Sequence, residues 1–460
     1  MSVADSTSAG SSRVRADLLR IYAAAVSAVE PGRLIARALD GAIDGGDDVP
    51  SIVASASGIY LLAVGKAAAG MAAQAQGCLG SKLKEGLIIV PGGGEIARTS
   101  PERGGSTTAA GLGNSRVLPA SHPIPDASSE AAGRAALGIA SHPKAGDLLL
   151  MLLSGGASAL MVAPAGSIKL ADKVAVTSGL MRAGATIREL NTVRKHLSLV
   201  KGGRILRALA PGVRVLTLIL SDVPGNDLAT IGSGPTAADP TTYSDAIAVM
   251  KPRGLWGRAP ESVRDHLERG AAGEFDETLK PGDPVMARVK NLIVGDNSSA
   301  IAAAIEAASA MGYAVERGRD LNGEANDVGR TLAAHLATIE RGRVCVIAGG
   351  EPVVTVKGNG RGGRAQQCAL AMALELARIA AGRRIAAIFA GTDGVDGPTD
   401  AAGAIVTPLT VRRGSEAGLD AQAALERNDS YMFFKALGDL VIIGPTGTNV
   451  ADIFVGLVNY

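Results

Sequence analysis

The stretch IYLLAVGKAAAGMAAQA, residues 59–75, decides the fold class. It opens with the apolar run IYLLAV, which lacks the polar alternation of a half-exposed strand. Such a run is typical of a strand that is buried on both faces of a parallel sheet. Glycine and lysine follow, and an alanine-rich helix pattern begins directly after them. The stretch therefore predicts a strand, a turn and a helix, the repeating unit of an α/β protein.

The same order recurs through most of the chain. Apolar runs that end near glycine open the stretches GLIIVPGGGE, DLLLMLLSGGASAL, VRVLTLILSDVPG, NLIVGDNSSAIAAAIEAA, RVCVIAGGEP and RIAAIFAGTDGVDG. A domain boundary is predicted between Asp239 and Pro284, because the later part of that region, residues 251–284, is polar, contains several prolines and glycines and has no strand candidate. We expect two α/β domains that face a cleft, lined by the glycine-rich strand ends where α/β sheets bind ligands. The Ser-, Ala- and Gly-rich N-terminus predicts a loose tail over residues 1–14.

Composition narrows the class of protein. Of the 460 residues, 47% are hydrophobic and 20% charged, which indicates a globular chain. The net charge of +2 and the 3% aromatic content argue against a nucleic-acid partner. No CxxC pair occurs among the cysteines, which indicates a reducing compartment without a zinc site. Because the N-terminus has no apolar core and no run reaches membrane-span length, we expect a cytoplasmic protein without a membrane partner.

Two strand ends carry candidates for anion binding. Lys66 stands between a strand and a helix, where its charge can reach a phosphate, although a solvated lysine fits that position equally well. The turn at Ser154, Gly155 and Gly156 offers N–H groups at a helix start, with a purely structural turn as the alternative. Ser154 lacks the GxSxG context of an acyl-transfer nucleophile.

The segment ELNTVRKHLSLVKGGR, residues 189–204, is strongly basic. At helical spacing its polar residues form one stripe, made of Asn191, Arg194, Lys195, Ser198 and Lys201. A solvated helix face is the ordinary reading of such a run. Because only Glu189 balances the charge, the pattern favours a helix that faces an anion.

Aspartates stand on glycine-rich loops after two apolar runs. LSDVPGNDLATIGSGPT contains Asp222, and AGTDGVDGPTDAAG contains Asp393, Asp396 and Asp400. Carboxylates at strand ends can bind Mg²⁺ or accept a proton from a hydroxyl, whereas ordinary turn chemistry explains each loop taken singly. Together the two loops favour a metal–phosphate site.

Two further glycine-rich loops lie near the C-terminus. GNGRGGR, residues 358–364, precedes a helix pattern at whose N-terminal edge unpaired N–H groups and Arg364 favour an anion. Its GxGxxG match lacks the downstream acidic residue of a dinucleotide site. GPTGTNVAD, residues 444–452, lacks the GK[ST] ending of a P-loop. Anion loops, basic side chains and carboxylate loops together fit a kinase that acts on a small acidic metabolite.

In this order the motifs resemble the glycerate 2-kinase family. They are AVGKAA, LLSGGASAL, LNTVRKHLSLVKGGR, SDVPGNDLATIGSGPT, GGEPVVTVKGNGRGGRAQQ, AGTDGVDGPTDAAG and NDSYMFFKALGDLVIIGPTGTNVADI. The resemblance implies an N-terminal Rossmann-like domain with a mostly parallel sheet, here residues 15–250, and a C-terminal MOFRL domain, residues 285–460. It implies ATP- and Mg²⁺-dependent phosphorylation of D-glycerate to 2-phosphoglycerate in the cleft. The polar stretch at residues 99–115 is longer than usual for the family and predicts an extended loop.

The resemblance places Lys66 and Arg364 as the catalytic lysine and arginine, and we add Asp222 as a catalytic residue. Asp222 and Asp393 are the expected metal ligands. The residues expected to bind the substrate are Ser154, Gly155, Gly156, Arg194, Lys195 and Lys201. The residues expected to bind the nucleotide are Gly358, Asn359, Gly360, Arg361, Gly363, Gly444, Thr446 and Asn449.

Two alternatives stay open from the sequence. A hydroxypyruvate reductase, a name often given to such sequences, needs a nicotinamide site, which the motifs do not supply. A non-catalytic sugar-phosphate sensor would keep the anion loops but would have no use for the aspartates. The oligomeric state is open as well, with a homodimer as one option.

Overall fold

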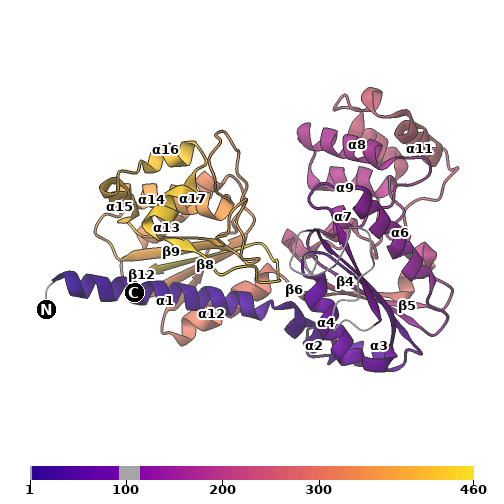
Figure 1. Ribbon diagram of the computed structural model, residues 1–460, viewed down its shortest axis with the longest axis horizontal. Coiled ribbons are helices and arrows are strands. Elements are labelled where there is room, and N and C mark those ends of the chain that lie inside the picture. Colours follow the sequence, from indigo (N-terminus) through magenta and orange to yellow (C-terminus); the bar gives the residue numbers. More distant parts are fainter. Residues whose placement is uncertain (1–2, 93–113) are drawn as a thin grey trace. The chain divides into compact units, whose positions relative to one another are not determined.

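The computed structural model describes residues 3–92 and 114–460, with side chains from residue 12 onward (Figure 1). The chain divides into two compact units. The central unit is Pro31–Val294, and the terminal unit joins Met1–Glu30 to Gly295–Tyr460. This division differs from the expected domains, 15–250 and 285–460, because residues 251–294 belong to the central unit and the N-terminal segment to the terminal one. Of the expected loop at 99–115, residues 99–113 lie outside the described residues.

The central unit contains a sheet with the strand order β3-β2-β1-β4-β5-β6. Its strands are β1 (Ile59–Val64), β2 (Leu83–Pro91), β3 (Ser115–Ala120), β4 (Leu148–Leu153), β5 (Arg214–Leu220) and β6 (Val289–Gly295). The pairings among β1 to β5 are all parallel. The order reverses between β1 and β4, which makes that point the topological switch point where such sheets bind ligands. The predicted α/β class with a Rossmann-like, mostly parallel sheet is confirmed.

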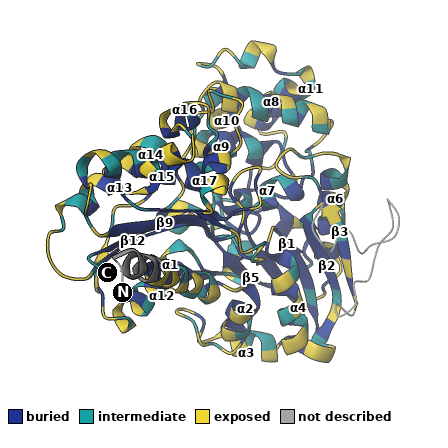
Figure 2. Ribbon diagram, turned by 60° about the vertical axis from the view of Figure 1, so that its left-hand side comes forward, coloured by how far each residue is buried: buried dark blue, intermediate teal, exposed yellow. Residues whose placement is uncertain are grey.

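Helices cover both faces of this sheet. α6 (Ala127–Ser141) packs on the face of Leu62, Val64 and Leu87, with the short α7 (Ala157–Leu160) beside it. The opposite face carries α2 (Pro31–Leu39), α3 (Val49–Ala54) and α4 (Ala68–Leu79) (Figure 2).

A group of four helices builds a second apolar cluster in the central unit, with Trp256 packed against it. These helices are α8 (Leu170–Arg182), α9 (Ile187–His196), α10 (Tyr243–Met250) and α11 (Glu261–Ala271). Trp256 is therefore a packing residue of this group.

The terminal unit has a mixed sheet in the order β11-β10-β9-β12-β8-β7. Its strands are β7 (Ala314–Arg317), β8 (Val344–Gly350), β9 (Ile385–Gly391), β10 (Gly403–Val406), β11 (Leu440–Val441) and β12 (Asp452–Val458). Strand β12 is antiparallel to both β8 and β9. The carboxyl ends of β8 and β9 therefore meet the amino end of β12 at one edge of the sheet.

Helices also cover both faces of the terminal sheet. α1 (Val3–Ala28) lies beside α12 (Asn297–Ala310) on one face, as Figure 1 shows. The other face carries α13 (Ala325–Thr338) and α14 (Arg364–Ile379), together with α15 (Thr410–Glu416), α16 (Ala421–Glu426) and α17 (Ser430–Leu437). Among the described residues, none of the helices combines the length and apolarity that crossing a bilayer requires.

Helix α1 begins at Val3, where the sequence predicted a loose tail over residues 1–14. Its apolar stripe, with Leu18, Ile21, Tyr22 and Ala25 fully buried, follows helical spacing. The Tyr22 hydroxyl donates to Gly391 O at 2.6 Å, at the end of β9. The polar first residues carry no apolar stripe of their own, so they offered no sign that the helix extends through them.

We expect Tyr22→Phe to lower the free energy of unfolding by about 1 kcal/mol, because the ring stays packed while one buried hydrogen bond is lost. Urea unfolding followed by circular dichroism measures this change. Tyr60→Phe, on a partly exposed tyrosine of β1, is the matched control. Equal stability of Tyr22→Phe and wild type would show that the contact with Gly391 does not hold α1 in place.

Candidate active-site residues and a cationic pocket

A pocket of about 210 Å³ in the central unit collects three cationic side chains, Lys173, Arg194 and Lys201. We call it the cationic pocket. His122 and Gly156 also line it, and no aspartate or glutamate occurs among its described lining residues. Its position beyond the end of β4 puts it near the topological switch point. The arrangement suits a small anion.

Lys201 is fully buried at the base of this pocket. Its Nζ donates to Ser158 O at 2.9 Å and to Ser158 Oγ at 3.2 Å. Burial and the nearby charges of Lys173 and Arg194 hold the pKa of Lys201 well below its usual value. Gly202 and Gly203, both with positive φ, form the turn that follows it.

Lys173 is a residue that the sequence reasoning missed. Its Nζ donates to Arg194 O at 3.2 Å and to Leu197 O at 3.1 Å, so it caps the C-terminal end of α9. Burial, followed by the charges of Arg194 and Arg204, lowers the pKa of Lys173 to about 7. A sequence signal existed, because Lys173 shares the buried stripe of α8 with Val176 and Leu180 at helical spacing.

The predicted single stripe of residues 191–201 is wrong in part. Helix α9 ends at His196, so Ser198 and Lys201 lie beyond it. Lys195 faces a different pocket, of about 350 Å³, where its Nζ pairs with the buried Asp239 at 3.3 Å. Arg194 and Lys195 are neighbours in sequence and therefore point to different sides of the helix. Of the predicted substrate residues, Arg194 and Lys201 come together and Lys195 does not join them.

The turn at the switch point positions Lys66. Ser154 Oγ accepts a hydrogen bond from Ala67 N at 3.0 Å, and Gly155 O accepts one from Lys66 N at 2.9 Å. A Cβ on Gly65 would overlap Ser154, so only glycine allows this approach. Ser154 is itself buried and its hydroxyl holds the turn, which makes it a positioning residue.

Gly156, which lines the cationic pocket, lies beside the side chain of Lys66. A Cβ on Gly156 would lie 3.2 Å from His122 Cδ2 and 3.6 Å from Lys66 Cγ. Burial and then the charge of Lys66 lower the pKa of His122. Asp222 follows β5 and therefore lies at the same edge of the sheet.

Arg364 lies at the corresponding edge of the terminal sheet, within a group of acids. Its Nε donates to Asp452 Oδ2 at 2.7 Å and its Nη2 to Asp452 Oδ1 at 3.1 Å, and it also pairs with Glu351. Burial alone would lower the pKa of Arg364, but the charges of Asp452 and Glu351 outweigh it and raise that pKa. The predicted catalytic arginine is thus neutralised by two carboxylates.

The first turn of α14 is closed to an external anion, contrary to the expectation. Asp396 accepts from Ala365 N at 3.1 Å and from Gln366 N at 2.8 Å. Burial, with a further contribution from Asp452, raises the pKa of Asp396 to about 7. A side chain of the same chain therefore takes the position at which a phosphate was expected.

The glycine-rich loop at 358–364 packs against residues 427–430. Asn428 Oδ1 accepts from Lys357 N and Gly358 N, Arg427 O accepts from Gly360 N, and Asp429 Oδ1 accepts from Arg361 N. A Cβ on Gly358 or Gly360 would overlap residues 427–429. These glycines therefore permit a close approach of two segments, and these four amides are used within the chain.

The loop at 444–449 brings Asp393 to the same edge as Arg364. Thr446 N donates to Asp393 O at 3.2 Å, and Thr446 Oγ1 donates to Thr392 O at 2.6 Å. Asn449 Oδ1 accepts from Ala451 N, directly before Asp452. Among the described residues, no three His, Cys, Asp or Glu side chains group closely enough to hold a metal. The two expected metal ligands, Asp222 and Asp393, belong to different units.

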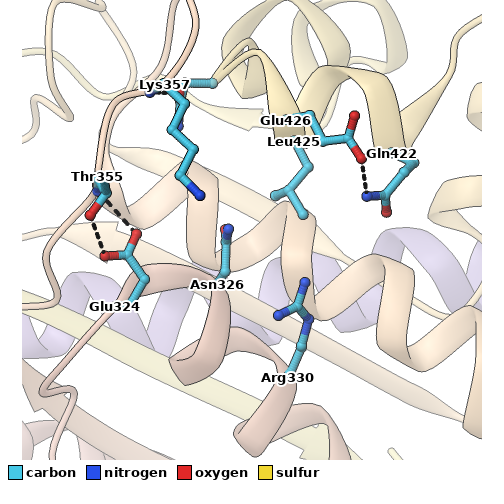
Figure 3. A pocket seen from close by; sticks show the side chains of 9 residues that line it. Glu324, Asn326, Arg330, Thr355, Lys357, Gln422, Leu425 and Glu426 are labelled. Carbon is cyan, nitrogen blue, oxygen red and sulfur yellow. Dashed lines mark hydrogen bonds between the residues drawn. The ribbon is translucent and has the colours of Figure 1, made fainter.

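A further pocket of about 320 Å³ adjoins the glycine-rich loop in the terminal unit. Figure 3 shows Lys357 directed into it from one side and Asn326 and Arg330, both of α13, from the other, while Glu324 accepts hydrogen bonds from Thr355. Nothing in the sequence pattern indicated this pocket, because its residues come from three separate segments that are spread over about 100 positions of the chain.

The doubly wound sheet, with a pocket near its switch point whose described lining residues are cationic and include no carboxylate, is the architecture of an α/β protein with a site suited to a small anion. The comparisons with known proteins make this class specific. A domain of unknown function, DUF4147, matches residues 17–268, and the MOFRL family matches residues 344–452. The chain belongs to the glycerate 2-kinase family.

Three similar proteins illustrate this membership. Glycerate 2-kinase of Pyrococcus horikoshii is 38% identical over 410 residues, 87% of either chain. A putative hydroxypyruvate reductase of Agrobacterium vitis is 43% identical over 350 residues, 74% of this chain and 77% of the relative. The crystal structure of glycerate kinase from Thermotoga maritima superposes with a TM-score of 0.82 at 34% identity, covering 97% of this chain and 100% of that one.

Proposed function

We propose that the protein transfers the γ-phosphoryl group of ATP to the 2-hydroxyl of D-glycerate, giving 2-phosphoglycerate. The cationic pocket carries the proposal, because three cations without a carboxylate suit a substrate and a product that are both anions. The similarity to kinases over most of the chain supports the reaction class.

Lys66 has the role of neutralising charge in this proposal. Phosphoryl transfer needs positioning and electrostatic stabilisation more than covalent chemistry from the protein. The main chain of Lys66 is fixed by its bond to Gly155, and its side chain lies beside Gly156, which lines the cationic pocket. Asp222, at the same edge, has the role of accepting the proton of the attacking hydroxyl.

Mg²⁺ fits the carboxylates available. The ion usually takes one or two carboxylates and completes its shell with water and substrate phosphates, so a three-residue cluster is not required. Asp393, which is partly exposed beside Asp452, offers such an oxygen ligand, and Asp222 is the second candidate. When bound, the ion neutralises charge on the phosphates.

For the nucleotide we retain the loops at 358–363 and 444–449 as the proposed contacts. Since the amides of Gly358, Gly360 and Arg361 in the first loop are used within the chain, the phosphates would be held by side chains such as that of Arg361. Lys357 and Arg330 of the adjoining pocket add positive charge there. A cytoplasmic location and a homodimer remain predictions.

The test is an assay of the purified chain with D-glycerate, ATP and Mg²⁺, with ADP release as the readout and ³¹P NMR to identify the phosphorylated hydroxyl. A parallel reaction contains hydroxypyruvate and NADPH. We expect ADP and 2-phosphoglycerate in the first and no oxidation of NADPH in the second. NADPH oxidation without ADP release would establish the reductase instead, and inactivity in both would favour a sensor.

A further inference from the structure

We propose that the cationic pocket is a phosphate-binding site, in which Lys173, Arg194 and Lys201 together bind a phosphate dianion in preference to a carboxylate. This inference adds a specific ligand site to the proposed function. It rests on that function only for the identity of the molecules that carry the phosphate. These molecules are the phosphorylated acid and the nucleotide.

Charge balance is the first argument. Buried charges in proteins are normally paired with an opposite charge. The neighbouring Lys195 follows that rule through Asp239, and Arg364 follows it through Asp452. The three cations of the pocket have no carboxylate among the described residues that line it. Without such a partner, burial and the neighbouring cations lower the pKa values of Lys173 and Lys201. A phosphate dianion favours the charged forms of both ammonium groups more than an anion with one negative charge does.

The hydrogen bonds of the two lysines are the second argument. An ammonium group has three N–H donors. Among the described residues, Lys173 Nζ has two main-chain acceptors, Arg194 O and Leu197 O, which leaves one donor for a ligand. Lys201 Nζ has three neutral acceptors, Ser158 O, Ser158 Oγ and Gly232 O, so the spare donor of the two lysines is the one on Lys173.

The shape of the donor set is the third argument. Arg194 adds a planar fork of N–H groups that can bind two oxygens of one anion. The pocket therefore offers more N–H donors than the two oxygens of a carboxylate can accept. Phosphate has more acceptor oxygens and can accept more of these hydrogen bonds. Ile124, Val162 and Met181 also line the pocket; Val162 is buried, whereas Ile124 and Met181 are exposed, so the pocket is open to solvent on that side.

The expected rival sites for phosphate are less suitable. Asp396 occupies the first turn of α14, and the segment at 427–430 occupies amides of the glycine-rich loop. Arg364 is already neutralised by Asp452 and Glu351. Of these sites, the cationic pocket of the central unit is the one whose described lining residues carry cations and no carboxylate.

Calorimetric titration of the full chain tests the inference at constant ionic strength. The ligands are inorganic phosphate, 2-phosphoglycerate, a non-hydrolysable ATP analogue and D-glycerate. We expect 2-phosphoglycerate to bind at least about tenfold more tightly than D-glycerate, the effect of one additional charge-assisted hydrogen bond. Lys173→Met and Arg194→Gln should each weaken binding of phosphate by a similar factor.

Lys169→Met is the matched control, because Lys169 is an exposed lysine directly before the same helix α8. It should leave phosphate binding unchanged. If the pocket variants weaken the binding of 2-phosphoglycerate more than that of the ATP analogue, the pocket binds the phosphate of the phosphorylated acid. If they weaken the binding of the ATP analogue more, the pocket binds a phosphate of the nucleotide. Either pattern supports the inference.

Two results would overturn it. One is equal affinity of the wild type for D-glycerate and 2-phosphoglycerate, a comparison that does not depend on the folding of any variant. The other is unchanged phosphate binding in both folded pocket variants. Kinase activity is measured separately, so activity without phosphate binding in the pocket refutes only this inference, and binding without activity refutes only the proposed function.

The pH dependence of binding gives a further readout. Lys173 lies near the charges of Arg194, Arg204 and Lys201. With a pKa of about 7, its ammonium group is about half deprotonated at pH 7 and mostly neutral at higher pH. A bound phosphate favours the charged ammonium, so binding takes up protons and affinity falls as pH rises from 7 to about 9. Lys173→Met should flatten this dependence, and an unchanged pH profile in that variant would count against the inference.

Discussion

Lys66→Ala is expected to lower kcat by about 10²-fold, the usual effect of removing one electrostatic stabiliser of a transition state. The fold should survive, because the bonds from Lys66 N to Gly155 O and from Ala67 N to Ser154 Oγ do not involve the lysine side chain. Steady-state kinetics with D-glycerate and ATP measure the change. If the charge acts mainly in the transition state, kcat falls and KM changes little.

The matched control is Lys84→Ala, which removes an exposed lysine from β2 in the same unit. An independent check uses His122, whose pKa is lowered by burial and by the charge of Lys66. Lys66→Ala should therefore raise the pKa of His122, which NMR titration of the histidine detects without any activity. Near-normal turnover in a variant that shows this rise in the pKa of His122 would mean that Lys66 has no catalytic role.

The fold of the central unit could be predicted because strands such as β1 and β4 are continuous apolar runs followed by glycine and a helix pattern. The edge strand β3, SRVLPA, has no such run and no glycine after it, so the sequence did not indicate it. The same reasoning could not give the direction of β12, since a fully buried strand reads alike in parallel and antiparallel pairing. Helix α1 was missed as part of the terminal unit because its partners, such as Gly391, lie several hundred residues away.

The candidate site shows a similar limit. Arg194 and Lys201 could be predicted from a local excess of positive charge, whereas Lys173 is a single lysine whose importance depends on its packing against the end of α9. A glycine-rich loop has the same pattern whether its amides bind an anion or another segment of chain. For Gly358 and Gly360 the segment at 427–430 decides, and no local pattern predicts that contact.

Arg364→Met is expected to lower the stability of the terminal unit by about 3–5 kcal/mol, the usual effect of removing one partner of a buried ion pair. Asp452 is almost fully buried, and burial already raises its pKa; in this variant its carboxylate also loses its strongest partner, so its charged form becomes more costly. Asp452→Asn removes the buried charge together with the pair, so it should cost less. The double variant should recover most of the loss, because neither charge is left without its partner.

Urea unfolding measures these changes, with hydrogen exchange to locate them. The chain has one tryptophan, Trp256, which lies in the central unit, so its fluorescence is a built-in control that should not change among the variants. Because the two units can unfold separately, each needs its own signal. An equal cost for Asp452→Asn and Arg364→Met would mean that the pair is not the source of the stability.

The same variants separate the structural role of Arg364 from a catalytic one. Asp452→Asn keeps the positive charge of Arg364 but removes the charge of its bidentate partner, so a folded Asp452→Asn protein that retains kcat would show that activity does not depend on this ion pair. Arg364→Lys keeps the charge as well, yet one ammonium cannot reproduce the paired N–H contacts to Asp452 while also reaching Glu351. If Arg364→Lys is stable and inactive, the guanidinium shape serves catalysis. The other outcome is that stability and kcat fall together in Arg364→Lys and both recover in the double variant Arg364→Lys/Asp452→Asn. That result would show that the arginine positions the amino end of β12 and the loop that carries Asp393.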